Sequence, residues 1–129
     1  MLRIRDVLVS RLWFASSSSR FFVVRTICLF PHYLICIIFG NDLSVNVKQK
    51  TPVVIYHALG IVVGSGVEFG KNVVLRARVT LGEDILNSKT APKIGDNVQF
   101  GIGSCVFGDV FIPSNRVLKA NKVYTKKNI

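Results

Sequence analysis

His57 is the residue of this sequence best suited to acid–base chemistry. The chain contains two histidines, His32 and His57, and an imidazole titrates in the range where it can take a proton from an alcohol at neutral pH. His32 follows Pro31 in a hydrophobic amino-terminal segment, and we expect it to be non-catalytic. His57 opens the stretch HALGIVVG, residues 57–64. The alternative interpretation is a surface or core histidine without a chemical role.

Charge and cysteine content narrow the class of protein. With 129 residues, 17 Lys and Arg against 7 Asp and Glu, and a net charge of +10, the chain should attract anions such as phosphate-bearing cofactors or acidic lipids. It lacks a compact arginine run, zinc-ligand spacing and an aromatic RNA-binding signature, so we expect neither nucleic acid nor a metal. Three unpatterned cysteines argue against a disulfide framework and for a reducing compartment. We therefore expect a cytoplasmic protein.

Apolar residues recur at every sixth position and predict a repetitive β structure. They are Val63, Phe69, Leu75 and Leu81, then Ile94, Phe100, Val106, Ile112, Leu118 and Tyr124. The residues three places after the first nine are Gly66, Asn72, Arg78, Asp84, Asn97, Gly103, Asp109, Asn115 and Asn121. Eight of these nine are Gly, Asn or Asp, which adopt positive φ at least cost. The pattern predicts one tight turn in every six residues.

A second apolar position follows the first by four places and holds Val67, Val73, Val79, Val98 and Val110. Short strands joined by corners, three to a triangular coil, would stack like residues over like and bury a continuous aliphatic column. The register breaks near His57 and again from Glu83 to Pro92, and functional residues tend to lie on such loops. Gln49 predicts an irregular first coil, and Arg116 and Lys122 predict a polar or frayed last coil.

We divide the chain into a hydrophobic helical segment, residues 1–40, and a β-helix, residues 41–129. The stretch from Phe21 to Phe39 is about as long as a minimal membrane span, but Arg25, Pro31 and His32 interrupt it. Three interpretations compete: helices that pack on a partner subunit, an anchor at the membrane surface, or a true span or signal peptide. The second would place the protein at the inner face of the membrane.

Residues 39–125 resemble the serine acetyltransferase-like branch of the hexapeptide acyltransferases. The resemblance rests on FGNDLSV, IYHALGIVVGSGVEFGKNVVLRARVTLGE and APKIGDNVQFGIGSCVFGDV, and HALGIVVG is its most specific part. It implies a mainly β fold, a left-handed parallel β-helix of hexapeptide repeats, preceded here by a short α-helical segment. It also implies a homotrimer and acetyl-CoA as co-substrate.

The resemblance assigns roles to individual residues. His57 would be the general base, and Asp42, fifteen residues earlier, would orient and stabilise its imidazole; the alternative for Asp42 is a turn cap after Gly40. Acetyl-CoA would lie in a groove between two subunits. Its contacts would be the backbones of Ile102 and Ala120, the Gly82 N–H at the thioester oxygen, and basic side chains, Lys119 with Lys122 and Lys126, at the phosphates. No Cys or Ser in the motif suits a covalent nucleophile, so direct transfer is expected.

Two departures from the family pattern bear on function. Tyr56 replaces an aspartate before the histidine, and Thr90 and Ala91 replace an Arg-His pair, so the groups that would hold zwitterionic serine are missing. We therefore expect an O-acetyltransferase acting on a sugar or surface-polysaccharide precursor. The alternatives are serine O-acetyltransferase of cysteine biosynthesis and a non-catalytic β-helix that serves as a binding or scaffold protein. The sequence ends at VYTKKNI, before a Gly-x-Pro-Ala-like segment of the resembling enzymes, so we expect reduced cofactor affinity.

Overall fold

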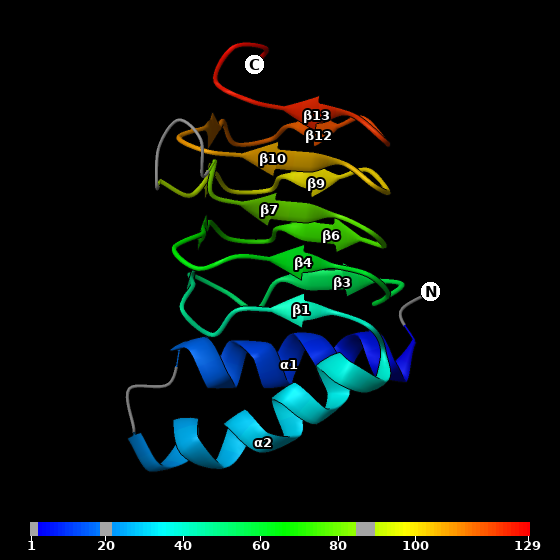
Figure 1. Ribbon diagram of the computed structural model, residues 1–129, viewed down its shortest axis with the longest axis vertical. Coiled ribbons are helices and arrows are strands. Elements are labelled where there is room, and N and C mark those ends of the chain that lie inside the picture. Colours follow the sequence, from blue (N-terminus) through cyan, green and yellow to red (C-terminus); the bar gives the residue numbers. More distant parts are fainter. Residues whose placement is uncertain (1–2, 19–21, 85–89) are drawn as a thin grey trace.

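The computed structural model describes residues 3–18, 22–84 and 90–129. Two helices, α1 (Ile4–Ser18) and α2 (Phe22–Ile38), precede a stack of short strands. Figure 1 shows the helices at one end of the stack and the carboxyl terminus at the other. The expected change from helix to β-helix near Gly40 falls within residues 39–41, which lie between the end of α2 at Ile38 and the start of β1 at Asp42.

Every strand pairs in parallel with the strand one coil away, and the strands form three sheets. Sheet A has the order β1-β4-β7-β10-β13, sheet B β11-β8-β5-β2, and sheet C β12-β9-β6-β3. The chain visits A, B and C in turn, so four complete coils are formed and β13 begins a fifth. The strands are β1 (Asp42–Leu43), β2 (Lys48–Gln49), β3 (Val54–Tyr56), β4 (Val62–Val63), β5 (Glu68–Phe69), β6 (Val74–Arg76), β7 (Thr80–Gly82), β8 (Lys93–Ile94), β9 (Gln99–Phe100), β10 (Cys105–Phe107), β11 (Phe111–Ile112), β12 (Val117–Leu118) and β13 (Val123–Tyr124).

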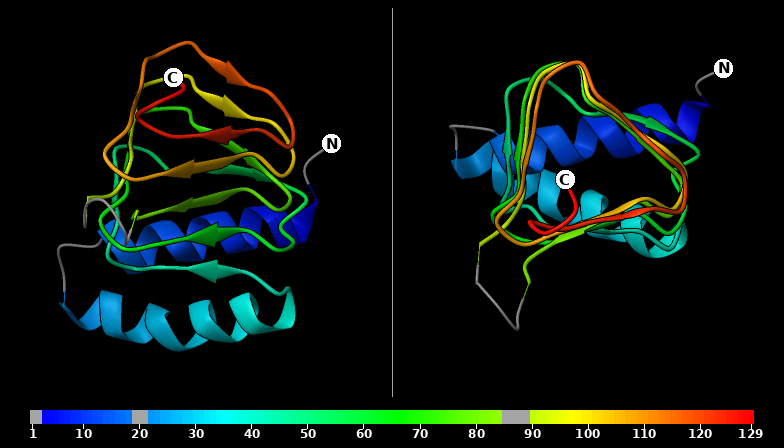
Figure 2. Two further views of the ribbon diagram at one scale, coloured as in Figure 1. Left: turned by 45° about the horizontal axis from the view of Figure 1, so that its top comes forward. Right: turned by 90° about the horizontal axis from the view of Figure 1, so that it is seen from above.

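The coil is left-handed. Seen from above in Figure 2, the path from sheet A to B to C runs clockwise while the chain rises toward the viewer. The fold class expected from the sequence, a left-handed parallel β-helix preceded by helices, is confirmed. This hand is an exception to the right-handed rule for parallel crossovers.

The predicted apolar positions form the core. All ten six-residue positions from Val63 to Tyr124 are buried, as are the five predicted valines at the corners. Within each strand the side chains alternate, so the neighbours of the core residues point outward. Stacking therefore hides one continuous column of aliphatic and aromatic side chains inside the triangle.

The corners turn as the sequence predicts. Seven of the nine predicted turn residues have positive φ, from 54° to 82°, and they include Arg78 at 59°. Asp84 and Asp109 are the exceptions. At Asp109 the left-handed residue is the preceding Gly108, at φ 82°, because glycine adopts this conformation without steric cost from a Cβ.

Helix α1 closes the open end of the apolar column. Trp13 and Val9 are fully buried, and the Trp13 ring meets Phe69 edge-on, with 5.5 Å between ring centroids. The Trp13 indole N–H donates to the Ser44 carbonyl at 2.8 Å. Gln49, which we expected to disturb the first coil, donates from its side-chain amide to the Ser17 hydroxyl at 2.9 Å. The polar residue in the column thus contacts the helix that caps it.

Helix α2 is attached to the first strand through a buried histidine. The Nε2–H of His32 donates to the Leu43 carbonyl at 2.9 Å, and the Cys36 sulfur lies 3.8 Å from this nitrogen. Burial lowers the pKa of His32 and raises the pKa of the Cys36 thiol, so both groups remain neutral near neutral pH. His32 thus has a structural contact in the fold, and its expected lack of a catalytic role stays a prediction.

Two predicted irregularities have different outcomes. Arg116 and Lys122 are exposed, and the Lys122 ammonium lies 5.4 Å from the centroid of the Tyr124 ring, so the last coil does have a polar edge. The loop predicted from Glu83 to Pro92 lies partly outside the described residues, which omit 85–89.

The His32 contact predicts acid-sensitive stability. Its pKa is lowered from 6.5 in the folded chain, so the unfolded chain binds the proton more readily, and stability falls as the pH drops below about 6.5. We expect the melting temperature to decrease between about pH 7.5 and about pH 5. His32→Gln, whose side-chain amide can also donate to Leu43, should flatten this decrease. An unchanged pH dependence in the variant would show that other groups cause it.

Candidate active site

His57 lies in an enlarged corner between sheets C and A. It directly follows β3, and the five residues 57–61, here called the His57 turn, connect to β4. Two of them, His57 at φ 57° and Gly60 at φ 65°, are left-handed, whereas the later corners between these sheets have one such residue each. The side chain of His57 is exposed. The predicted register break is therefore a real bulge that presents an imidazole to solvent.

Buried polar contacts fix the His57 turn. The Asn41 side chain, which is buried, accepts from Ile61 N–H at 3.0 Å and donates to the Ala58 carbonyl at 3.3 Å. The Gly60 N–H donates to the Gly40 carbonyl at 3.1 Å. The side chains of Ala58 and Ile61 are fully buried in the core. Packing and hydrogen bonds on both sides of the turn therefore restrict the backbone conformation of His57 at its start.

Asp6 of α1 also stabilises the His57 turn, from the side of the helices. Its carboxylate, 1% exposed, accepts from the Ala58 N–H at 2.8 Å and pairs with the Arg5 guanidinium at 3.4 Å. Burial alone would raise the pKa of Asp6, but the N–H groups of Ala58, Arg3 and His57 and the charge of Arg5 hold it below its ordinary value. A buried negative charge thus binds the backbone that carries the candidate base.

The His57 imidazole borders a groove on the outer side of sheet C. This groove, here called the His57 groove, has a volume of about 290 Å³ and is lined by Tyr56, His57, Val74, Arg76, Gln99 and Ile102. Arg76 donates from Nη1 to the Phe100 carbonyl at 3.1 Å. The groove brings together the predicted base and Ile102, one of the residues predicted to contact the cofactor.

Asp42 lies close to the His57 turn along the backbone. Its N–H donates to the Ile61 carbonyl at 2.8 Å, and it pairs in register with Val62. Its side chain is exposed, and although both residues are within the described part of the chain, no hydrogen bond or ion pair joins Asp42 to His57. Its role as the orienting carboxylate stays a prediction.

The other predicted cofactor residues divide into two groups. Ala120 lies at the same corner as Ile102, one coil further, where the Asn121 N–H donates to the Ile102 carbonyl at 2.8 Å. Lys119 borders a small groove of about 180 Å³ that also contains Arg116 and Lys122. Gly82 is the last residue of β7, where the chain leaves sheet A toward sheet B, whereas His57 lies where the chain enters sheet A from sheet C, so a single chain does not bring the two together. A Cβ at Gly82 would meet only the Phe107 ring, at 3.9 Å, so its backbone can be approached closely.

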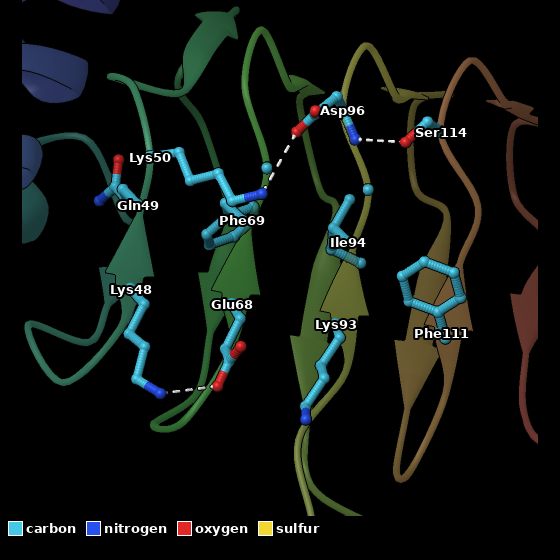
Figure 3. Close-up of a pocket in the computed structure, with 12 residues that line it drawn as sticks. Lys48, Gln49, Lys50, Glu68, Phe69, Lys93, Ile94, Asp96, Phe111 and Ser114 are labelled. Atoms are coloured by element: carbon cyan, nitrogen blue, oxygen red, sulfur yellow. Dashed lines mark hydrogen bonds and ion pairs between the residues drawn. The ribbon is translucent and has the colours of Figure 1, made fainter.

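A larger groove, of about 400 Å³, crosses sheet B away from His57. Four of its five charged side chains form two ion pairs, Lys48 with Glu68 at 2.8 Å and Lys50 with Asp96 at 3.8 Å, and Figure 3 draws both pairs. These pairs offset much of the charge that an ionic ligand would need. Among the described residues there is also no group of three or more His, Cys, Asp or Glu side chains able to hold a metal ion.

Sequence reasoning missed Asp6 and Arg76. Asp6 contacts a residue 52 positions away, and only the arrangement of α1 under the first coil reveals this. Arg76 could have been found, because it is one place after the six-residue position of Leu75 and therefore points outward, in register with Tyr56 beside the candidate base.

Comparison with known proteins shows sequence relatives over the β-helix. No family model matches the chain. The chain is 34% identical over 89 residues to serine acetyltransferase 3, mitochondrial, of Arabidopsis thaliana, which is 68% of this chain and 23% of that protein. It is 34% identical over 91 residues to the serine acetyltransferase of Mycobacterium tuberculosis, 70% of this chain and 40% of the relative. The chain thus spans less than half the length of these relatives.

Solved structures show the same fold over nearly the whole chain. A truncated serine acetyltransferase apoenzyme superposes with a TM-score of 0.78 at 22% identity, over 93% of this chain and 50% of that one. Soybean serine acetyltransferase complexed with serine gives a TM-score of 0.71 at 22% identity, over 95% and 55% of the two chains. The serine acetyltransferase of Brucella abortus gives a TM-score of 0.71 at 21% identity, over 96% of this chain and 54% of that one. These likenesses, at 21% to 22% identity, show the shared fold, and the sequence matches make the β-helix of this chain similar to serine acetyltransferases.

Proposed function

We propose that the chain is an acetyl-CoA-dependent O-acetyltransferase with His57 as general base and the side-chain hydroxyl of serine as acceptor. The observation that carries the proposal is the exposed imidazole of His57, held in a rigid bulge beside a groove that also contains Ile102. The relatives are named serine acetyltransferases, but this chain matches only 23% to 40% of their length. The activity of the whole protein is therefore an inference from the site.

The chemistry is a direct transfer. His57 takes the hydroxyl proton as the acceptor oxygen attacks the thioester carbon, because an alcohol is almost wholly protonated at neutral pH. The new C–O bond forms, the C–S bond breaks, and the resulting imidazolium returns the proton to the departing thiolate. Asp42 would stabilise this imidazolium through the electrostatic attraction of its carboxylate.

An extended acyl carrier can follow the corner between sheets C and A. Three coil steps separate the His57 turn from Ala120, roughly 14 Å at the usual strand spacing. Ile102 lies between them, and Arg116, Lys119 and Lys122 surround the groove at the end of the stack. This order would place the thioester at His57, the arm along Ile102 and Ala120, and the phosphates among the basic side chains.

A homotrimer would complete the site. The outward residues of sheets A and C are largely apolar and include the exposed Val62, Val117 and Val123, whereas those of sheet B include Lys48, Glu68 and Lys93. Apolar faces A and C suit contacts between copies, and the charged face B suits water. Because Gly82 lies at the carboxyl end of its strand in sheet A and His57 lies at the corner before the amino ends of these strands, a partner copy would have to bring its N–H to the thioester oxygen.

Serine is favoured over a sugar as acceptor. From the sequence we expected a sugar or polysaccharide precursor, but the relatives do not support it, since they are named for serine. Arg76 lines the His57 groove, and its guanidinium offers the planar donors that a serine carboxylate needs. Tyr56 beside the base is the observation that keeps a sugar as second candidate, because an aromatic ring can pack on a sugar face.

The acceptor can be tested by measuring thiol release with L-serine or with nucleotide sugars. We expect turnover with L-serine, and we expect Arg76→Gln to raise KM for serine about tenfold, as the loss of a charged hydrogen bond implies, with KM for acetyl-CoA unchanged. Turnover of a nucleotide sugar without turnover of serine would overturn the acceptor and leave acetyl transfer intact.

His57→Ala tests the base. We expect kcat to fall about a hundredfold or more, because a positioned general base contributes this much, while the affinity for acetyl-CoA is nearly unchanged. Lys93→Ala, on sheet B far from the corner, is the matched control and should keep wild-type kcat. Full activity in the His57 variant would remove the histidine from the mechanism.

Asp6 is expected to act as a positioning residue. Asp6→Ala removes the acceptor of the Ala58 N–H, so the turn can shift, and we expect kcat to fall by up to about a hundredfold without a rise in KM for acetyl-CoA. Asp6→Asn, which keeps an acceptor oxygen, should recover much of the loss. Assays must be run below the melting temperature of each variant. A folded Asp6→Ala protein with wild-type kcat would contradict the positioning role.

A further inference from the structure

Helix α2 exposes an unusually large apolar surface. Its large hydrophobic side chains with 45% to 82% exposure, here called the α2 face, are Phe22, Val23, Val24, Ile27, Phe30, Tyr33, Leu34, Ile37 and Ile38. The opposite side of the helix packs on the protein through the buried His32 and Cys36 and through Ile35. Contiguous apolar surface of this kind marks a site of interaction.

The width of the α2 face indicates a flat partner. At 3.6 residues per turn, the exposed apolar residues from Phe22 to Ile38 cover an arc of about 200°. A helix that pairs with one other helix shows a narrower seam. A wide arc with Phe22, Phe30 and Tyr33 among its members suits the boundary between lipid headgroups and acyl chains.

The charges around this face are of one sign. Residues 1–40 of the sequence contain five arginines and a single acidic residue, Asp6, and the Asp6 carboxylate is 1% exposed and paired with Arg5. Arg25 is the one ionised side chain of α2, and it is exposed. At about 100° per residue, Arg25 lies on the side of α2 away from the centre of the α2 face, where it would reach headgroups beside the helix. A surface of anionic headgroups is complementary to the excess of arginine in this layer.

The attachment of α2 favours a helix that lies on a bilayer. No helix in the described ranges is long and apolar enough to cross a membrane. His32 ties the middle of α2 to β1 through the Leu43 carbonyl. Figure 1 shows α2 crossing the end of the stack, with the C-terminus at the far end, so a bilayer could contact the α2 face and leave the His57 groove open to solvent.

We propose that the α2 face is a docking surface for a bilayer that contains anionic phospholipids. The apolar side chains would enter the upper acyl region, and Arg25 would meet the headgroups. This docking is independent of the proposed acetyl transfer, because no residue of the His57 groove takes part in it.

Vesicle flotation of the full chain tests the proposal. We expect the protein to float with vesicles of phosphatidylcholine and phosphatidylglycerol, and more weakly with phosphatidylcholine alone. Ile27→Gln combined with Phe30→Gln should lower the partition coefficient about a hundredfold, from the lost burial of two side chains. Arg25→Gln should lower it about fivefold on anionic vesicles only. Phe111→Gln, a similarly exposed side chain on sheet B, should bind like the wild type.

Because the substituted side chains are exposed, the variants should keep the circular dichroism spectrum and melting temperature of the parent. Failure of the parent to float with anionic vesicles would overturn the proposal, as would equal flotation of the double variant. A sedimentation experiment without lipid measures the mass of the assembly for the parent and for the double variant. If the double variant reduces the mass of the assembly in the absence of lipid, a second copy covers the α2 face and the membrane proposal is wrong.

Discussion

The structure depends on one constraint, that the chain adopts a left-handed backbone conformation, with positive φ, at the corners of each coil. Each coil must turn three times within about eighteen residues, and the apolar column stays in register only if the turning residues stack. In the row of corners that lead into sheet A, the residues with positive φ are Gly40, His57, Gly60, Arg78, Gly103 and Asn121. Backbone hydrogen bonds connect these corners from coil to coil, as from the Gly103 N–H to the Ala77 carbonyl at 3.0 Å. Within this regular row, the His57 turn is the one place where extra residues enter.

The extra residues are tolerated because their polar groups are satisfied and their apolar groups are buried. Asp6 and Asn41 supply the hydrogen bonds, and Ala58 and Ile61 fill the core. A left-handed conformation at a non-glycine residue is unfavourable in isolation and persists where the surroundings determine it. The helical layer thus has two functions in the fold. It closes the column through Trp13, and it fixes the residue that we assign as the base.

The sequence was sufficient for most of the β-helix because the repeat is local. A side chain's place in the column follows from its position within six residues, so the core valines and seven turn residues were predicted correctly. Gly108 was missed as a turn residue because the spacing alone could not distinguish it from Asp109. Asp6 could not be predicted, since its partner lies 52 residues away and the docking of α1 depends on the whole first coil. The relatives do not support the preference for a sugar acceptor, which rested on residues missing from the family pattern and did not consider Arg76.

The central claim is that the corner beside His57 accepts an acyl carrier, and titration calorimetry of acetyl-CoA into the full chain tests it most directly. We predict saturable binding at or below about millimolar cofactor, the usual range for enzyme substrates. Ile102→Glu should abolish the binding, because it places a negative charge beside the path of an anionic cofactor. Absence of heat from the wild-type chain at millimolar acetyl-CoA would contradict the account and favour a β-helix that serves as a non-catalytic scaffold.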